Sequence, residues 1–96
     1  MNDRHPTLPA LREFLRGYFH QDCIEEYGSL DRAARRFVQD ADHQQSKAVA
    51  AEWRQFLEQS KRLTLERFNQ ALRAMGSGCA VASNEEIKKI TSVLRG

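Results

Sequence analysis

The sequence predicts an all-α fold, a compact bundle of about five helices in a single domain. Apolar residues recur at helical spacing in every long segment, and no segment alternates apolar and polar residues as a strand would. Both prolines precede Ala10, so nothing breaks the helical pattern beyond that point. The 96 residues are 41% hydrophobic and 29% charged, a composition that suits one globular core. We therefore expect residues 1–96 to form one complete domain.

The first predicted helix begins near Thr7, which can cap it, and ends at about Phe19. Pro9 is tolerated in the first turn, where its missing N–H costs no hydrogen bond. Gly17 lies inside the helix, which predicts either a close approach by another backbone or a tolerated imperfection. The apolar stripe of this helix is Leu8, Leu11, Phe14, Leu15, Tyr18 and Phe19.

A polar segment follows at residues 20–29, too short for a full helix but long enough for a turn of its own. Ser29 is a good N-cap for a second helix, expected over residues 30–40. Asp42 and Gln45 form a capping-box pattern that opens the third and longest helix. The core positions of these two helices are Leu30, Ala33, Ala34, Phe37, Val38, Val49, Trp53, Phe56 and Leu57.

Two shorter helices complete the prediction. One covers residues 65–75 and ends before Gly76, which is expected at the C′ position just past the helix. The other is opened by a second capping-box pattern, formed by Ser83 and Glu86. The core positions of these helices are Leu65, Phe68, Leu72, Met75, Ile87, Ile90, Val93 and Leu94.

The lack of targeting signals and the sparse cysteines predict a cytoplasmic protein. The N-terminal residues lack the apolar run of a signal peptide, and no stretch has the length and apolarity of a membrane span. Cys23 and Cys79 do not make the dense cysteine framework of small secreted domains, so a reduced compartment is expected.

The distribution of charge predicts a local acidic surface. The net charge is only +2, yet residues 20–31 hold four acidic residues and no Lys or Arg. Such a segment attracts a basic partner, and Tyr27 is an aromatic residue of the kind enriched at interfaces. The alternative is an ordinary solvated segment without a binding role. Asp31, for example, lies in the first turn of a helix, where an acidic residue stabilises the helix without any partner. The candidate partner-binding residues are Asp22, Glu25, Glu26, Tyr27, Asp31, Asp40 and Asp42.

The same segment contains residue types that occur in catalytic and metal sites. His20, Asp22 and Cys23 contain the residue types of a nucleophile, a base and an orienting group, but neighbours in sequence rarely reach that geometry. Adding His43 gives four possible metal ligands without the paired short spacing of a zinc site. We therefore expect no enzymatic activity, no metal and no other cofactor.

Nucleic-acid binding is the alternative function. It would use exposed basic residues that lie between the core positions of amphipathic helices, where a solvated face is equally expected. These residues are Arg32, Arg35 and Arg36 on one helix, and Lys61, Arg62, Arg67 and Arg73 further along.

The N-terminal forty residues resemble a known family. They contain the motif YFHQD, then EYGS, then a helix with alanine and phenylalanine. This pattern resembles the immunity proteins of bacterial contact-dependent growth inhibition (the CdiI family), in the small helical group that the YFHQD motif marks. Cys23 departs from the pattern, since members usually have a tryptophan there. The motif residues are Tyr18, Phe19, His20, Gln21 and Asp22.

The resemblance implies a cytoplasmic inhibitor that is encoded beside a toxin. Such a protein binds the toxin's C-terminal effector domain one-to-one, and the effector is frequently a nuclease that acts on tRNA. Neither direct nucleic-acid binding nor membrane binding is implied. A motif shared among proteins with different partners is expected to support the scaffold rather than to select the toxin.

Overall fold

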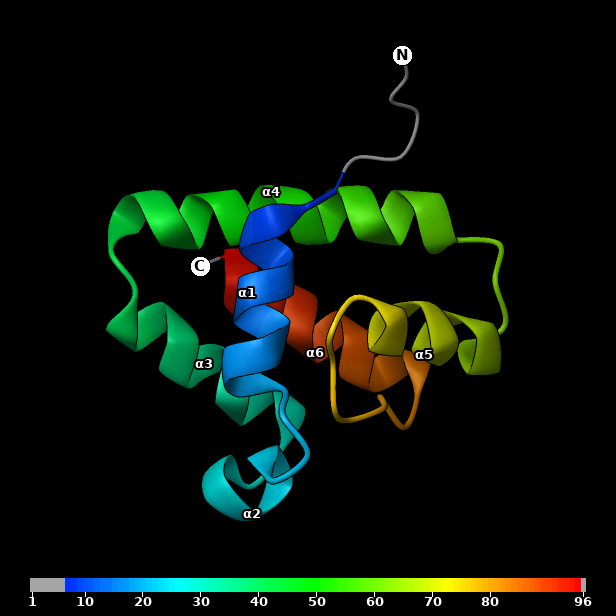
Figure 1. Ribbon diagram of the computed structural model, residues 1–96, viewed down its shortest axis with the longest axis horizontal. Helices are drawn as coiled ribbons and strands as arrows, with labels where there is room; N and C mark the ends of the chain where they lie inside the picture. Colours follow the sequence, from blue (N-terminus) through cyan, green and yellow to red (C-terminus); the bar gives the residue numbers. More distant parts are fainter. Residues whose placement is uncertain (1–6, 96) are drawn as a thin grey trace.

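The computed structural model describes residues 7–95, and within that range every regular element is a helix (Figure 1). The all-α fold is confirmed, with one helix more than predicted. The six helices are α1 (Pro9–Tyr18), α2 (Cys23–Tyr27), α3 (Leu30–Asp40), α4 (His43–Ser60), α5 (Leu65–Ala74) and α6 (Asn84–Arg95).

The additional helix, α2, lies in the polar segment that was expected to hold at most a turn. It has only five residues, too few to be stable alone. Cys23, its first residue, is fully buried, and α2 packs against α3. Tertiary contacts therefore stabilise a helix that the local sequence does not predict.

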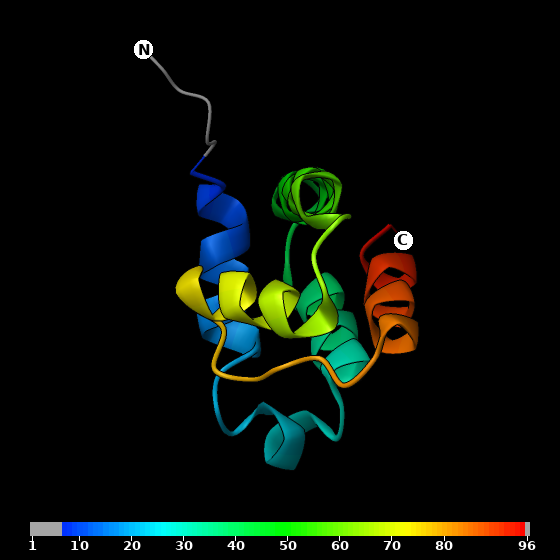
Figure 2. The same ribbon diagram turned by 90° about the vertical axis from the view of Figure 1, so that its right-hand side faces the viewer.

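The long helix α4 lies at one end of the molecule, and α2 projects at the opposite end in both views (Figures 1 and 2). Between these ends, α3 packs against α6, and both α1 and α6 pack against α4. The core lies where these helices meet. Its centre is Trp53, which is 1% exposed and whose indole N–H donates to Thr91 Oγ1 at 2.9 Å.

Three predicted N-caps are confirmed. Ser29 accepts a hydrogen bond from the Arg32 N–H at 3.3 Å, and Asp42 accepts one from the Gln45 N–H at 2.8 Å. At α6, Ser83 accepts from the Glu86 N–H at 3.2 Å. The Glu86 carboxylate accepts from the N–H of Ala82 at 2.7 Å instead of that of Ser83.

The predicted C-cap of α5 is also confirmed. Gly76 follows the last residues of the helix with φ 118°, a left-handed conformation that glycine adopts without strain.

Two expectations about α1 are wrong. Leu8, rather than Thr7, occupies the N-cap position, and its own side chain makes no capping bond. The Glu52 carboxylate of α4 instead accepts the Leu11 N–H in the first turn, at 2.9 Å. Burying the Leu8 side chain, which is 4% exposed, accompanies a left-handed backbone with φ 52°. Gly17 is exposed, and a Cβ there would meet no atom of another element within 4 Å, so it is a tolerated imperfection rather than a site of close approach.

Candidate partner-binding site

The exposed face of α2 combines acidic residues with an apolar one. Ile24 is 48% exposed, and Asp22, Glu25 and Glu26 beside it are also exposed. Within residues 7–95, only one other large hydrophobic residue, Leu63, is comparably exposed, at 41%. We call Asp22, Ile24, Glu25, Glu26 and Tyr27 the α2 surface. The sequence prediction missed Ile24, although an isoleucine between acids in a polar segment was a usable signal.

His20 connects the motif to the α2 surface. Its Nδ1 accepts the backbone N–H of Asp22 at 3.1 Å, which places the ring proton on Nε2. Nε2 lies 3.0 Å from the Glu26 carboxylate. The imidazole ring therefore bridges the start of α2 to its last turn and holds the Glu26 side chain in place.

Stacked tyrosines extend the site toward α3. The rings of Tyr18 and Tyr27 stack with centroids 6.0 Å apart, and the Tyr18 hydroxyl donates to Asp40 Oδ2 at 3.0 Å. Arg36 Nε also donates to Asp40, at 3.1 Å, so the negative charge of Asp40 is partly offset. The structure thus places Asp40 next to the α2 surface, but its carboxylate is already hydrogen-bonded to Tyr18 and Arg36.

Ionisation of the two tyrosines is expected to lower the stability of the protein at alkaline pH. Burial raises the pKa of both Tyr18 and Tyr27 above the ordinary 10.0, and the hydrogen bond to Asp40 raises the pKa of Tyr18 further. Because the folded state holds these protons more tightly than the unfolded state, the contribution is present below pH 10 and is lost as pH rises through the folded pKa. Phenolate absorbance should therefore titrate at higher pH in the folded protein than in urea.

A matched pair of variants assigns this shift. Asp40→Asn should lower the pKa of Tyr18 toward its ordinary value, whereas Glu66→Gln on α5 should leave the titration unchanged. Equal midpoints for folded and urea-unfolded protein would contradict the expected protection of the phenols.

The remaining predicted acids lie elsewhere. Asp31 accepts a hydrogen bond from Ser29 Oγ at 2.8 Å and lines a depression of about 260 Å³ together with Glu85 and Glu86 of α6. These two glutamates, distant in sequence, were not among the predicted partner-binding residues. Asp42 caps α4 through the Gln45 N–H and so has a local structural contact.

The motif residues join three parts of the chain. The Phe19 side chain is 0% exposed, and its carbonyl accepts the Gly78 N–H at 2.6 Å. A Cβ on Gly78 would lie 2.6 Å from the Gln21 backbone nitrogen, so only glycine fits this approach. The His20 carbonyl accepts from the Cys23 N–H at 2.9 Å. The motif therefore connects α1, α2 and the loop between α5 and α6, while the Gln21 side chain is exposed.

The possible catalytic triad is not assembled in this arrangement. Cys23 Sγ lies 2.9 Å from Cys79 Sγ, and burial, with the neighbouring thiol, raises the pKa of Cys23 to about 12. The ring of His20 is engaged by Glu26 and the Asp22 N–H. For the part of the chain that the structure describes, no three His, Cys, Asp or Glu side chains come together as a metal site would require.

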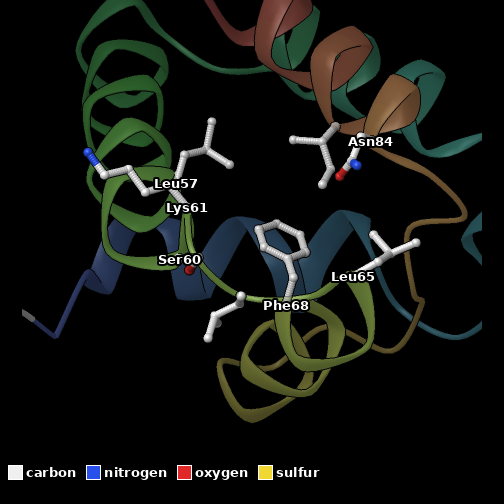
Figure 3. A pocket seen from close by; sticks show the side chains of 8 residues that line it. Leu57, Ser60, Lys61, Leu65, Phe68 and Asn84 are labelled. Carbon is white, nitrogen blue, oxygen red and sulfur yellow. The ribbon is translucent and has the colours of Figure 1, made fainter.

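An apolar pocket of about 240 Å³ lies where the C-terminal end of α4 meets α5 and α6 (Figure 3). The Phe68 ring points into the space between Leu57 and Asn84 (Figure 3). Leu63 lies on its lining, and none of the predicted partner-binding residues does. Its lining residues are Leu57, Ser60, Lys61, Leu63, Leu65, Phe68, Asn84 and Ile87.

The basic residues considered for nucleic-acid binding are exposed, as predicted: Arg32, Arg35 and Arg36 on α3, Lys61 and Arg62 just after α4, and Arg67 and Arg73 on α5. Lys61 is paired with Glu58 at 2.8 Å. Arg36 is paired with Asp40, whereas Arg32 and Arg35 make no ion pair within residues 7–95. Two unpaired arginines on one helix are a small basic surface compared with the several phosphate contacts of a typical nucleic-acid interface.

Among residues 7–95, no helix has the length and apolarity needed to span a membrane. Comparison with protein families matched residues 7–85 to the CdiI immunity protein family. Neither the curated proteins nor the solved structures gave a match. The aligned residues run from the start of α1 into α6 and include the YFHQD motif and the whole α2 surface. The chain therefore belongs to the CdiI immunity protein family.

Proposed function

We propose that this immunity protein acts in the cytoplasm by binding the C-terminal effector domain of a cognate toxin through the α2 surface. The observation that carries the proposal is the exposed Ile24 among the carboxylates of Asp22, Glu25 and Glu26, at an end of the molecule that projects from the bundle. An apolar centre with a charged rim is the usual composition of a specific protein interface.

The acidic rim favours a basic partner such as a nuclease. A nuclease holds its polyanionic substrate with Lys and Arg, and carboxylates can occupy the same positions as phosphates. Asp22 and Glu25 make no ion pair within residues 7–95, so their charges are available to a partner. We infer that the toxin is a nuclease, of which a tRNA-cleaving enzyme is one kind, and that the bound immunity protein occludes it without any catalysis of its own.

The supports of α2 suit rapid and tight binding. Buried Cys23, the His20–Glu26 contact and the packing on α3 hold the helix before any partner arrives. A preformed surface loses little conformational entropy on binding. The carboxylates accelerate encounter, and Ile24 with Tyr27 then slows dissociation by burying apolar area. We expect a one-to-one complex that buries about 800 Å² on each partner.

Co-expression tests the function. The protein is produced in bacteria together with the open reading frame encoded immediately upstream, and growth rescue and co-purification are measured. Rescue with a stable complex supports immunity by direct binding. If the upstream product is not toxic and no complex forms, the result favours the nucleic-acid alternative. That alternative predicts an RNA affinity that depends on Arg32, Arg35 and Arg36, and whose logarithm falls linearly with the logarithm of the salt concentration.

Reversing two charges tests the acidic rim. Glu25→Lys with Glu26→Lys should slow association with the toxin by about tenfold or more at low salt, with a smaller effect at high salt. Glu58→Lys with Glu66→Lys makes the same charge change on exposed positions of α4 and α5 and should leave the rate nearly unchanged. Stopped-flow kinetics distinguishes the two variants, and equal rates for both would refute the acidic rim while leaving immunity intact.

A further inference from the structure

The two cysteines are neighbours in space although they lie 56 positions apart. Cys23 is 0% exposed on the inner side of α2, and Cys79 is half-buried in the loop between α5 and α6. Their Sγ atoms are 2.9 Å apart, both as free thiols. A disulfide requires about 2.0 Å between the sulfur atoms, so the two Sγ atoms must come about 0.9 Å closer to form one.

Several contacts hold Cys79 in this position. Its Sγ donates to the His20 carbonyl at 3.0 Å, and its carbonyl accepts from Ser77 Oγ at 2.6 Å. The neighbouring Gly78 N–H donates to the Phe19 carbonyl at 2.6 Å. These hydrogen bonds hold the backbone of the loop against the motif, and they keep the Cys79 sulfur close to the Cys23 sulfur.

We propose that Cys23 and Cys79 form a reversible disulfide when the protein meets hydrogen peroxide. The Cys79 sulfur, which is the more accessible, attacks one peroxide oxygen, the O–O bond breaks, and the thiol proton leaves with the other oxygen as water. The resulting sulfenic acid on Cys79 is attacked by the Cys23 sulfur. The S–O bond then breaks, and the departing hydroxide takes the Cys23 proton to form a second water. Two thiols are oxidised and one peroxide is reduced.

The disulfide would fasten the element that carries the proposed binding surface. It would tie α2 covalently to the loop before α6 and close a long stretch of chain, which restricts the unfolded state. The expected rise in Tm is roughly 10 °C. Ile24 points to the exposed side of α2, so the cross-link leaves the α2 surface accessible.

The test is chemical and does not involve a toxin, so its failure would leave the proposed function untouched. The reduced full-length chain is freed of reductant, treated with a small excess of hydrogen peroxide, quenched in acid and examined by intact mass and peptide mapping. We expect a loss of two hydrogen atoms, a peptide pair that joins Cys23 to Cys79, recovery with dithiothreitol and a higher Tm before reduction. An unchanged mass, added oxygen without a cross-link, or cross-links only between two molecules would overturn the proposal.

Cys23→Ser is the matched control. It should stop at the sulfenic acid on Cys79, which dimedone traps, because the resolving thiol is missing. If circular dichroism shows a folded variant and dimedone does not label Cys79, the assignment of Cys79 as the first sulfur oxidised is wrong. The wild-type measurement needs no variant and decides on the disulfide itself.

Discussion

Trp53→Ala is expected to lower the free energy of unfolding by about 3–5 kcal/mol, a large share of the roughly 5–15 kcal/mol typical of a small domain. Trp53 is 1% exposed and lies on α4, where its ring packs against Phe56 and Phe68. Its removal leaves a cavity that the surrounding helices cannot fill without moving. Urea unfolding followed by circular dichroism measures the loss.

Thr91→Val separates the hydrogen bond from the packing. This variant keeps the size of the side chain but removes the acceptor of the indole N–H, and it should cost about 1–3 kcal/mol. If Trp53→Ala cost no more than Thr91→Val, the packing of the indole would not be central to stability. A Trp53→Ala variant that unfolds at the urea concentration of the wild type would contradict the assigned core.

The features that the sequence predicted well depend on residues close together in the chain. Helical periodicity needs only positions three and four apart, and an N-cap needs only a polar side chain and an N–H three residues later. Ser29, Asp42 and Ser83 were found in this way, as was Gly76 at the end of α5. These local interactions form in much the same way whatever packs around them.

The missed features depend on contacts between distant residues. Helix α2 is stabilised by burial of Cys23, and Leu8 takes the N-cap position of α1 because its side chain enters the core. The approach of Gly78 to Gln21 joins positions that no local pattern relates. Such features follow from how the helices pack, which a single sequence does not reveal.

The candidate site was predicted in part for the same reason. The acids on α2 were visible as a local charge pattern, and the helix brings Asp22, Glu25 and Glu26 to one exposed end. Asp42 caps α4 and Asp40 is paired with Arg36, since each meets a partner within four residues. Whether any of these carboxylates contacts a toxin remains a prediction.

Ile24→Asp is expected to weaken binding of the toxin by about 30-fold or more, which corresponds to a loss of about 2 kcal/mol. The substitution removes the apolar centre of the α2 surface while adding a negative charge. If charge alone attracted a basic toxin, the variant would bind more tightly than the wild type. The fold should tolerate the change, because Ile24 is exposed in the first turn of α2, where an acid is favoured by the helix dipole.

Leu63→Asp is the matched control, since Leu63 is the other exposed large hydrophobic residue of the described chain and lies at the apolar pocket near α5. Isothermal titration with the effector domain, together with growth rescue, should show lost binding for Ile24→Asp and normal binding for Leu63→Asp. The reverse result would move the interface to the pocket between α4, α5 and α6. Lost binding in both variants, with unchanged circular dichroism, would mean that the toxin contacts both the α2 surface and the pocket. Normal binding in both variants would show that Ile24 is not part of the interface.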